Sequence, residues 1–232
     1  RDRKIKVGIS IGDPNGVGIE IILKIFQDKR MFDFFTPIVF ASTKLLSGQQ
    51  KYFNLQSALS PYDLNKKPSN NQINVVEVLK QPFQTTFGEA TKEGAAVAIA
   101  SLKAATKALK EGTIDVLVTA PINKHNIQSE TFDFPGHTDF LAKELGGDSL
   151  MFMVSDTLKV GLLTDHIPVS KVAAAIQPEL IKTKVAKMKI SLIEDFGLVK
   201  PKIAILGINP HTGDNGVIGK EDDSILRPTI KE

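Results

Sequence analysis

The sequence predicts an α/β protein with two α/β/α units built around largely parallel sheets. Strand-like apolar runs alternate with helical patterns along nearly the whole chain of 232 residues, which is the order produced when helices connect parallel strands. Some of these runs, such as residues 116–118 and 203–206, are continuously apolar instead of alternating. Such runs are typical of strands that helices cover on both faces.

The expected strands are the apolar runs themselves. They are Lys4–Ile11, Pro37–Ala41, Ile73–Val78, Ile114–Thr119, Ser149–Val154, Leu158–Leu163 and Lys202–Ile208. The expected helices are Gly18–Gln27, Glu89–Lys110 and Pro178–Phe196. The second of these helices is rich in alanine and ends at Gly112, a common helix stop.

Two irregular segments and the end of the chain define the expected domains. Residues 56–72 combine prolines with asparagines and predict an exposed loop. The apolar periodicity breaks near residue 128, so we expect one domain over residues 1–128 and a second over residues 129–232. Residues 222–232 look like a helix start that is cut short. We therefore expect the C-terminal part of the second domain to be missing.

Composition excludes several classes of function. The chain has 29 Lys and Arg against 26 Asp and Glu, and no run of five or six like charges, so we expect no binding to nucleic acid. With no cysteine, a disulfide framework, an iron–sulfur cluster and a thiolate zinc site are excluded. No apolar run is long enough for a membrane span, and no signal-peptide core follows the first residues. We expect a cytoplasmic protein.

A glycine-rich turn, residues 12–18, joins the first strand to the first helix. It lacks the third glycine of a dinucleotide fingerprint, and no Gly-Lys-Ser/Thr follows as in a P-loop. Two interpretations stay open. Its backbone N–H groups face an anion at the helix N-terminus, or the turn only allows close packing of strand and helix.

Two histidines directly follow apolar strands. His166 comes after residues 160–163, and His211 comes after residues 203–206. Ligands of open α/β sheets bind outside the carboxyl ends of the strands, and neutral imidazole is a good ligand for divalent ions. The pair is therefore a candidate for two ligands of a metal site. The alternative is two loop histidines that hydrogen-bond to the backbone.

Three further residues suit an anion. His137 and Thr138 follow Gly136 at an expected helix start, where a hydroxyl and free N–H groups fit a phosphate or carboxylate. Alternatively, Thr138 is a plain N-cap and His137 is incidental. Lys124 follows the strand Ile114–Thr119 and either contacts an anionic substrate or is an ordinary exposed lysine. Together, these loops indicate a small-anion site with a metal ion.

Five motifs occur in order along the chain. They are Gly12-Asp13-Pro14-x-Gly16-x-Gly18-x-Glu20, Thr119-x-Pro121-x-x-Lys124, Gly136-His137-Thr138-x-Phe140, Thr164-x-His166-x-Pro168 and Asn209-Pro210-His211-x-Gly213. With these motifs the chain resembles the 4-hydroxythreonine-4-phosphate dehydrogenase family of pyridoxal-phosphate biosynthesis over essentially its whole length. The resemblance implies a fold similar to isocitrate and isopropylmalate dehydrogenases, with the active site in the cleft between the two units and at a homodimer interface.

The resemblance also implies an activity. The family oxidises the 3-hydroxyl of 4-phosphohydroxy-L-threonine with NAD or NADP, and the resulting β-keto acid loses carbon dioxide to give 3-amino-2-oxopropyl phosphate. Two alternatives stay open. A related dehydrogenase would act on phosphothreonate or a cyclic diol carboxylate. A non-catalytic fragment, from a different class, would serve as a binding or assembly module.

The site residues follow from the same resemblance. His166 and His211 match two of the three histidines that hold a divalent ion (Zn, Mg, Co or Mn), and the third is expected from the other subunit. His137 and Thr138 match the substrate-binding pair. The resemblance singles out no catalytic residue in this chain, and the nicotinamide contacts are expected beyond Glu232.

Overall fold

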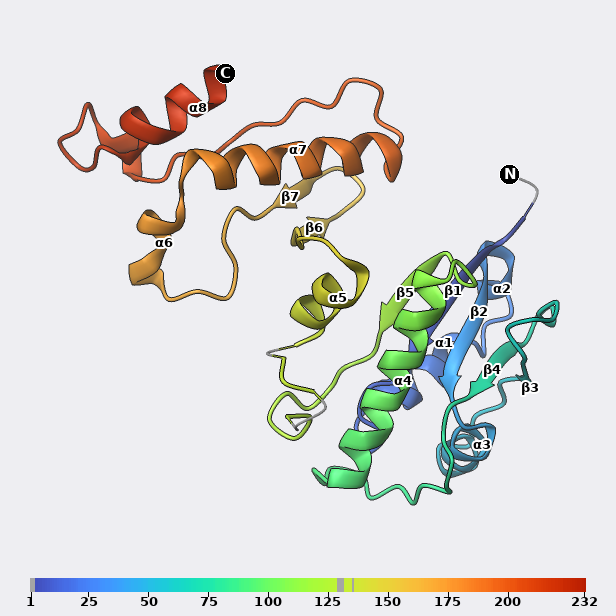
Figure 1. Ribbon diagram of the computed structural model, residues 1–232. Coiled ribbons are helices and arrows are strands. Elements are labelled where there is room, and N and C mark those ends of the chain that lie inside the picture. Colours follow the sequence, from blue (N-terminus) through green and yellow to red (C-terminus); the bar gives the residue numbers. More distant parts are fainter. Residues whose placement is uncertain (1–2, 129–131, 135) are drawn as a thin grey trace. The chain divides into compact units, whose positions relative to one another are not determined.

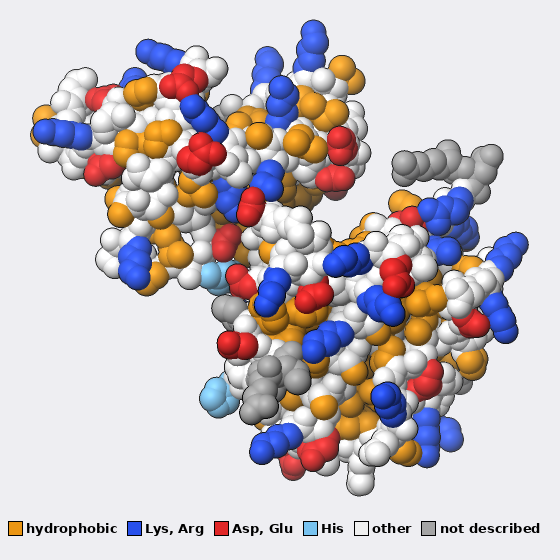
Figure 2. All heavy atoms as spheres, in the orientation of Figure 1, with side chains coloured by type: hydrophobic (Ala, Val, Ile, Leu, Met, Phe, Trp, Pro, Cys, Tyr) orange, Lys and Arg blue, Asp and Glu red, His pale blue; other side chains and the backbone are white. Residues whose placement is uncertain are grey.

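A computed structural model describes residues 3–128, 132–134 and 136–232 of the chain (Figure 1). The chain divides into two compact units, Arg1–Gly147 and Asp148–Glu232. No helix among the described residues is long and apolar enough to cross a membrane. On the face shown in Figure 2, Lys and Arg side chains are interspersed with Asp and Glu, as the nearly balanced composition predicts.

The first unit contains a five-stranded parallel sheet, which confirms the predicted α/β class. Its strands lie in the order β3-β4-β2-β1-β5, and every neighbouring pair is parallel. They are β1 (Ile5–Ser10), β2 (Phe35–Ala41), β3 (Leu59–Pro61), β4 (Ile73–Glu77) and β5 (Val116–Thr119). The four strands predicted here are confirmed. The loop prediction for residues 56–72 is wrong at β3, where three residues pair with the start of β4 at the sheet edge.

Helices cover both faces of this sheet. The helices of the unit are α1 (Gly18–Ile25), α2 (Met31–Phe34), α3 (Thr43–Tyr52), α4 (Lys92–Lys110) and α5 (His137–Leu145). In Figure 1, α4 crosses one face of the sheet and α1 lies behind the other. The hydroxyl of Thr91 accepts a hydrogen bond from the N–H of Gly94 and caps the start of α4.

The side chains of the central strand β2 alternate between two apolar cores. Ile38 and Phe40 pack in the core beneath α4, whereas Val39 and Ala41 pack in the core that contains α1. Both cores exclude water, which explains why a continuously apolar run is needed at this strand.

The edge strand β5 departs from the prediction. The sequence predicted burial on both faces for residues 116–118, but Val116 and Val118 are 45% and 49% exposed. Both valines pair in register with β1 on one side, and no described strand pairs with the other side of β5. Leu117 still packs in the core beneath α4. The face of β5 that carries Leu117 is therefore covered by the core, whereas the face that carries the two valines stays partly exposed.

The first unit extends beyond the domain boundary expected at residue 128. Ile127, Phe132 and Phe140 are buried together with Ala98, Ile99 and Leu102 of α4. This third apolar cluster joins α5 to the first unit, so the compact units divide after Gly147.

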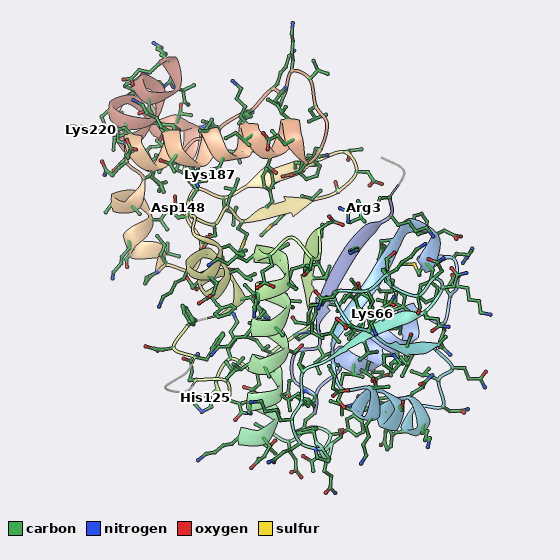
Figure 3. The ribbon with its side chains drawn as sticks, turned by 45° about the vertical axis from the view of Figure 1, so that its right-hand side comes forward. Arg3, Lys66, His125, Asp148, Lys187 and Lys220 are labelled. Carbon is green, nitrogen blue, oxygen red and sulfur yellow. The ribbon has the colours of Figure 1, made fainter. Side chains whose placement is uncertain are left out.

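The second unit is smaller. It contains the antiparallel strands β6 (Phe152–Val154) and β7 (Lys159–Gly161) and the helices α6 (Val169–Ala175), α7 (Pro178–Glu194) and α8 (Arg227–Lys231). Ile176, Ile181 and Leu226 form its core. Lys187 of α7 forms an ion pair of 3.3 Å with Asp148 at the start of the unit (Figure 3).

The strand predicted at Lys202–Ile208 is not formed. Residues 201–207 pair with no strand among the described residues. Ile205 and Ile208 pack on the core of the second unit, but Leu206 is exposed. Apolar composition favours a strand only where a neighbouring strand supplies hydrogen bonds, and β6 and β7 bond to each other instead.

Candidate functional site

The glycine-rich turn packs tightly against the segment after β5, at the carboxyl edge of the sheet. Gly12 has a φ of +66°, and a Cβ on this residue would lie 2.1 Å from the carbonyl oxygen of Pro121. The N–H of Asp13 donates to the same oxygen at 2.9 Å. A Cβ on Gly18 would lie 2.5 Å from the carbonyl oxygen of Ile11. Close backbone approach explains both glycines.

The side chain of Asn15 stabilises this turn through hydrogen bonds to residues 86–91. Its buried amide nitrogen donates to the carbonyl of Glu89 at 3.0 Å and to the hydroxyl of Thr91 at 3.1 Å, and its oxygen accepts the N–H of Thr86 at 2.9 Å. Three backbone N–H groups of residues 13–16 donate to Pro121 or to acceptors within the turn. Because those donors are occupied, the geometry favours the tight-turn interpretation over an anion site at the turn itself.

The structure brings Lys124, His137 and Thr138 together at the start of α5. The N-cap of this helix is Gly136, so the interpretation of Thr138 as the N-cap is wrong. The Cε atom of Lys124 lies 3.8 Å from the position that a Cβ on Gly136 would occupy. Pro135, which precedes this motif, lies outside the described residues. A lysine and the N-terminal end of a nine-residue helix therefore face the same region.

The imidazole of His137 is electrostatically unusual. Burial lowers its pKa, and the positive charge of Lys124 lowers it further. Its Nε2 atom is buried and has no hydrogen-bond partner among the described residues. Buried polar atoms almost always have a hydrogen-bond partner. The unpaired Nε2 is therefore a candidate group for hydrogen bonding to a ligand. The lysine and the positive end of the helix dipole make an anion the favoured ligand here.

Phe140 fixes the position of α5. Its ring is 2% exposed and lies 5.2 Å from the ring of Phe132 and 5.3 Å from the ring of Phe134, measured between centroids. The same cluster contacts Ile99 and Leu102 of α4. The last aromatic residue of the Gly-His-Thr-x-Phe motif thus anchors the helix whose first turn carries His137.

His166 and His211 both belong to the second unit, and both are exposed. Both have left-handed backbone angles, with φ values of 50° and 52°. The Nδ1 atom of His166 lies 3.4 Å from a carboxylate oxygen of Asp165. Among the described residues, no group of three or more His, Asp or Glu side chains could hold a metal ion. The chain therefore presents two exposed imidazoles and no complete metal site within its described part.

Asp222 is a residue that sequence reasoning missed. It is 1% exposed, and its carboxylate accepts the N–H groups of Ile208 and Asn209 just before His211. Burial alone would raise the pKa of Asp222, but these N–H groups, the Asn209 amide and the charge of Arg227 together lower it. From the sequence, Asp222 could be identified only as an acidic residue of an expected helix start, because its hydrogen-bond partners lie more than ten residues away.

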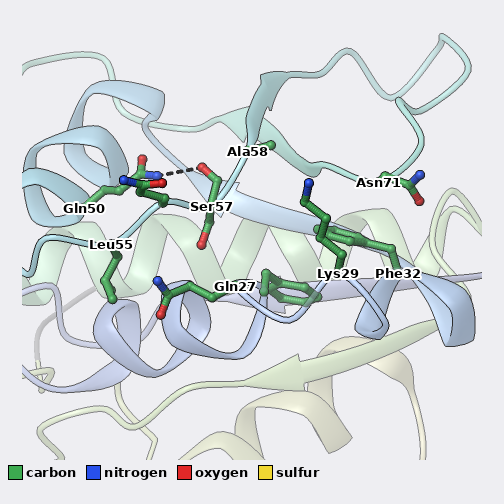
Figure 4. Close-up of a pocket in the computed structure, with 10 residues that line it drawn as sticks. Gln27, Lys29, Phe32, Gln50, Leu55, Ser57, Ala58 and Asn71 are labelled. Carbon is green, nitrogen blue, oxygen red and sulfur yellow. Dashed lines mark hydrogen bonds between the residues drawn. The ribbon is translucent and has the colours of Figure 1, made fainter.

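One cavity in the described part of the chain lies away from these residues (Figure 4). It has a volume of about 390 Å³ and is lined by residues near the beginnings of β2, β3 and β4, including Phe26, Lys29, Ser57 and Asn71. It contains none of the predicted site residues. His125 lies on the surface of the first unit (Figure 3).

Comparisons with known proteins agree with the motif order. Residues 33–232 match the family described as "Pyridoxal phosphate biosynthetic protein PdxA". A protein of Bacteroides thetaiotaomicron named 4-hydroxythreonine-4-phosphate dehydrogenase is 40% identical over 100% of this chain and 64% of its own length. A Sulfurihydrogenibium protein of the same name is 36% identical over 98% of this chain and 70% of its own length.

A solved structure shows the same fold. The crystal structure of a 4-hydroxythreonine-4-phosphate dehydrogenase from Burkholderia phymatum has a TM-score of 0.86 at 26% identity, over 99% of this chain and 71% of that protein. The chain thus spans between 64% and 71% of the lengths of these proteins.

Proposed function

Because the chain belongs to the family of the pyridoxal phosphate biosynthetic protein PdxA, we propose that it serves the oxidation of 4-phosphohydroxy-L-threonine at its 3-hydroxyl. In the proposed reaction, NAD or NADP takes the hydride from carbon 3, and the hydroxyl proton is released. The carboxylate then leaves as carbon dioxide, and the remaining carbon takes up a proton to give 3-amino-2-oxopropyl phosphate. The names of the relatives in the comparisons support this substrate.

The arrangement at the start of α5 is the observation that carries the proposal. Lys124 supplies a positive charge, and the first turn of α5 supplies N–H groups that have no partner within a helix. The hydroxyl of Thr138 takes no part in capping this helix. Together, these groups would bind an anionic end of the substrate, either its phosphate or its carboxylate.

His137 has a defined role in this proposal. Because its pKa is lowered, the imidazole is neutral near neutral pH, and a neutral ring can either donate or accept at Nε2. An anion bound beside it would favour the protonated form and raise its pKa again. Substrate binding is therefore expected to raise the pKa of this imidazole.

The residues of the second unit fit two ligands of a divalent ion. Asp165 lies beside Nδ1 of His166, which leaves Nε2 of that ring for a metal, and an imidazole–carboxylate pair is the usual arrangement around metal-binding histidines. His211 is exposed, with no hydrogen bond to its ring among the described residues. A bound ion would lower the pKa of the substrate hydroxyl and stabilise the enolate left by decarboxylation. We propose that the third histidine comes from the other subunit of a homodimer.

The test is NADH formation by this chain with 4-phosphohydroxy-L-threonine, NAD and a divalent ion, with and without a chelator. We expect chelator-sensitive turnover that His166→Ala and His211→Ala abolish, whereas the surface variant His125→Ala retains it. Full activity in both histidine variants would show that the metal assignment is wrong. No turnover by the wild-type chain would instead support the non-catalytic alternative.

A second substrate deserves the same assay because some relatives are named for D-threonate 4-phosphate. That substrate keeps the phosphate and the hydroxyl but lacks the amino group. The groups at the start of α5 recognise an anion, which both substrates supply. The ratio of kcat/KM for the two substrates therefore decides between them.

A further inference from the structure

We propose that Asp222 and Arg227 are positioning residues that hold the loop of His211 from both sides. The inference rests on the proposed function only in taking His211 as a metal ligand. The two side chains come from one short helical segment, the π-helical turn Asp222–Leu226 and the start of α8. Neither residue has a hydrogen bond to the imidazole in the described structure; each bonds residues within three positions of His211 in the chain.

Asp222 holds the residues before His211. One carboxylate oxygen accepts the N–H of Ile208 at 2.8 Å, and the other accepts the N–H and the side-chain amide of Asn209, both at 3.0 Å. Glu221 accepts a further hydrogen bond from that amide at 2.9 Å. A buried carboxylate that accepts three hydrogen bonds is a strong fixed point, because charged acceptors form shorter and stronger bonds than neutral ones.

Arg227 holds the residue after His211. Its guanidinium donates to the hydroxyl of Thr212 at 2.9 Å. It also forms an ion pair of 2.8 Å with Asp223, one turn earlier in the same segment. This pair restrains the long arginine side chain, which lowers the conformational entropy lost when it bonds Thr212.

The π-helical turn explains why both residues reach the same loop. In an α-helix, residues five apart point about 140° away from each other. Here the N–H of Arg227 bonds the carbonyl of Asp222, the i to i−5 pattern of a π-helix, which places residues five apart one above the other. Asp222 and Arg227 consequently share one face, directed at residues 208–212.

The loop needs such support. His211, Thr212 and Asp214 all have φ values between 46° and 52°, a left-handed conformation that is unfavourable for residues other than glycine. It is most unfavourable for β-branched residues such as Thr212. Backbone of this kind persists only when surrounding contacts enforce it, and it is concentrated at functional sites. Asp222 and Arg227 supply side-chain hydrogen bonds to this loop, in addition to the backbone bonds from the N–H of Thr212 to Asn209 and from the N–H of Asp214 to His211.

The experiment compares Asp222→Asn and Thr212→Val with the wild-type chain. Asparagine keeps the shape of Asp222 but replaces one acceptor oxygen with a donor, and valine keeps the β-branched shape of Thr212 without its hydroxyl. Amide hydrogen exchange in residues 204–213 reports the loop, and Co²⁺ titration followed by its absorption bands reports the metal. The matched control is Asp156→Asn, an exposed acid of the same unit.

We expect Asp222→Asn to speed exchange at Ile208 and Asn209 at least tenfold and to weaken Co²⁺ binding about 10- to 100-fold, the usual effect of losing a partner behind a metal ligand. Thr212→Val should show smaller changes in the same direction, with exchange in α7 unaltered, and the control should match wild type. Unchanged exchange or Co²⁺ affinity within twofold of wild type in Asp222→Asn would overturn the proposal. If the wild-type chain binds no Co²⁺, the metal assignment fails, and the exchange data alone decide whether the two residues hold the loop.

Discussion

Replacing Phe140 by alanine tests whether tertiary packing, and not the helix itself, places the first turn of α5. The ring is 2% exposed and contacts two other phenylalanine rings at centroid distances of 5.2 and 5.3 Å. Truncating a buried phenylalanine costs about 3–5 kcal/mol, of which the two ring pairs account for roughly 1–3 kcal/mol. We therefore expect Phe140→Ala to lower the free energy of unfolding of the first unit by about 3 kcal/mol or more.

Urea unfolding followed by far-UV circular dichroism measures this effect. With a slope of about 2 kcal/mol per molar urea, the midpoint should fall by roughly 1.5 M. Phe34→Ala is the matched control, since this ring is 72% exposed in α2 and its removal should change stability by less than about 0.5 kcal/mol. A loss of less than about 1 kcal/mol in Phe140→Ala, comparable to the control, would refute the assignment of this ring as the anchor of α5.

Three further predictions concern backbone and charge. Gly12→Ala should destabilise the first unit by at least about 2 kcal/mol in the same urea assay, because a Cβ would meet the backbone of Pro121 at a left-handed position. Gly48→Ala, inside α3 with no atom within 4 Å of the added methyl, should instead stabilise the first unit by about 0.5–1 kcal/mol. A loss of stability in Gly48→Ala would show that the available space and the backbone φ do not determine the effect of alanine at these two positions. The pKa of His137 in the folded state lies below the value of 6.5 in the unfolded chain. Lowering the pH through 6.5 therefore protonates the unfolded state first, and the free energy of unfolding should fall. Urea midpoints at about pH 7.5 and 5.5 should differ less in Lys124→Met, since this change removes a charge that lowers the His137 pKa; an equal difference would exclude that coupling.

Local sequence patterns were sufficient for most elements of the first unit. The continuous apolar runs at β1, β2 and β4, and the alanine-rich helix that ends near Gly112, depend on burial and on helix propensity, which are properties of short segments. The prediction was wrong where a neighbour decides the outcome. Residues 116–118 are as apolar as the central strands, but the fold covers only one face of β5 and leaves two valines about half exposed. Lys202–Ile208 has a strand composition and no strand to pair with among the described residues.

For the candidate site as well, some features could be predicted from the sequence and others depended on the fold. Its chemical groups could be predicted directly from the sequence. Lys124, His166 and His211 follow apolar runs, and His137 and Thr138 stand at an expected helix start. Motif order was likewise sufficient to indicate the family, which the comparisons show.

The environment of those groups required the folded chain. Lys124, which lowers the pKa of His137, lies thirteen residues before it in the chain. Asp222 accepts hydrogen bonds from Asn209, which also lies thirteen residues before it. The glycine-rich turn is closed by Asn15, whose partners lie more than seventy residues further along. Charge and hydrogen bonding act through distances in space, so a pattern along the chain identifies the groups but not the contacts that tune and hold them.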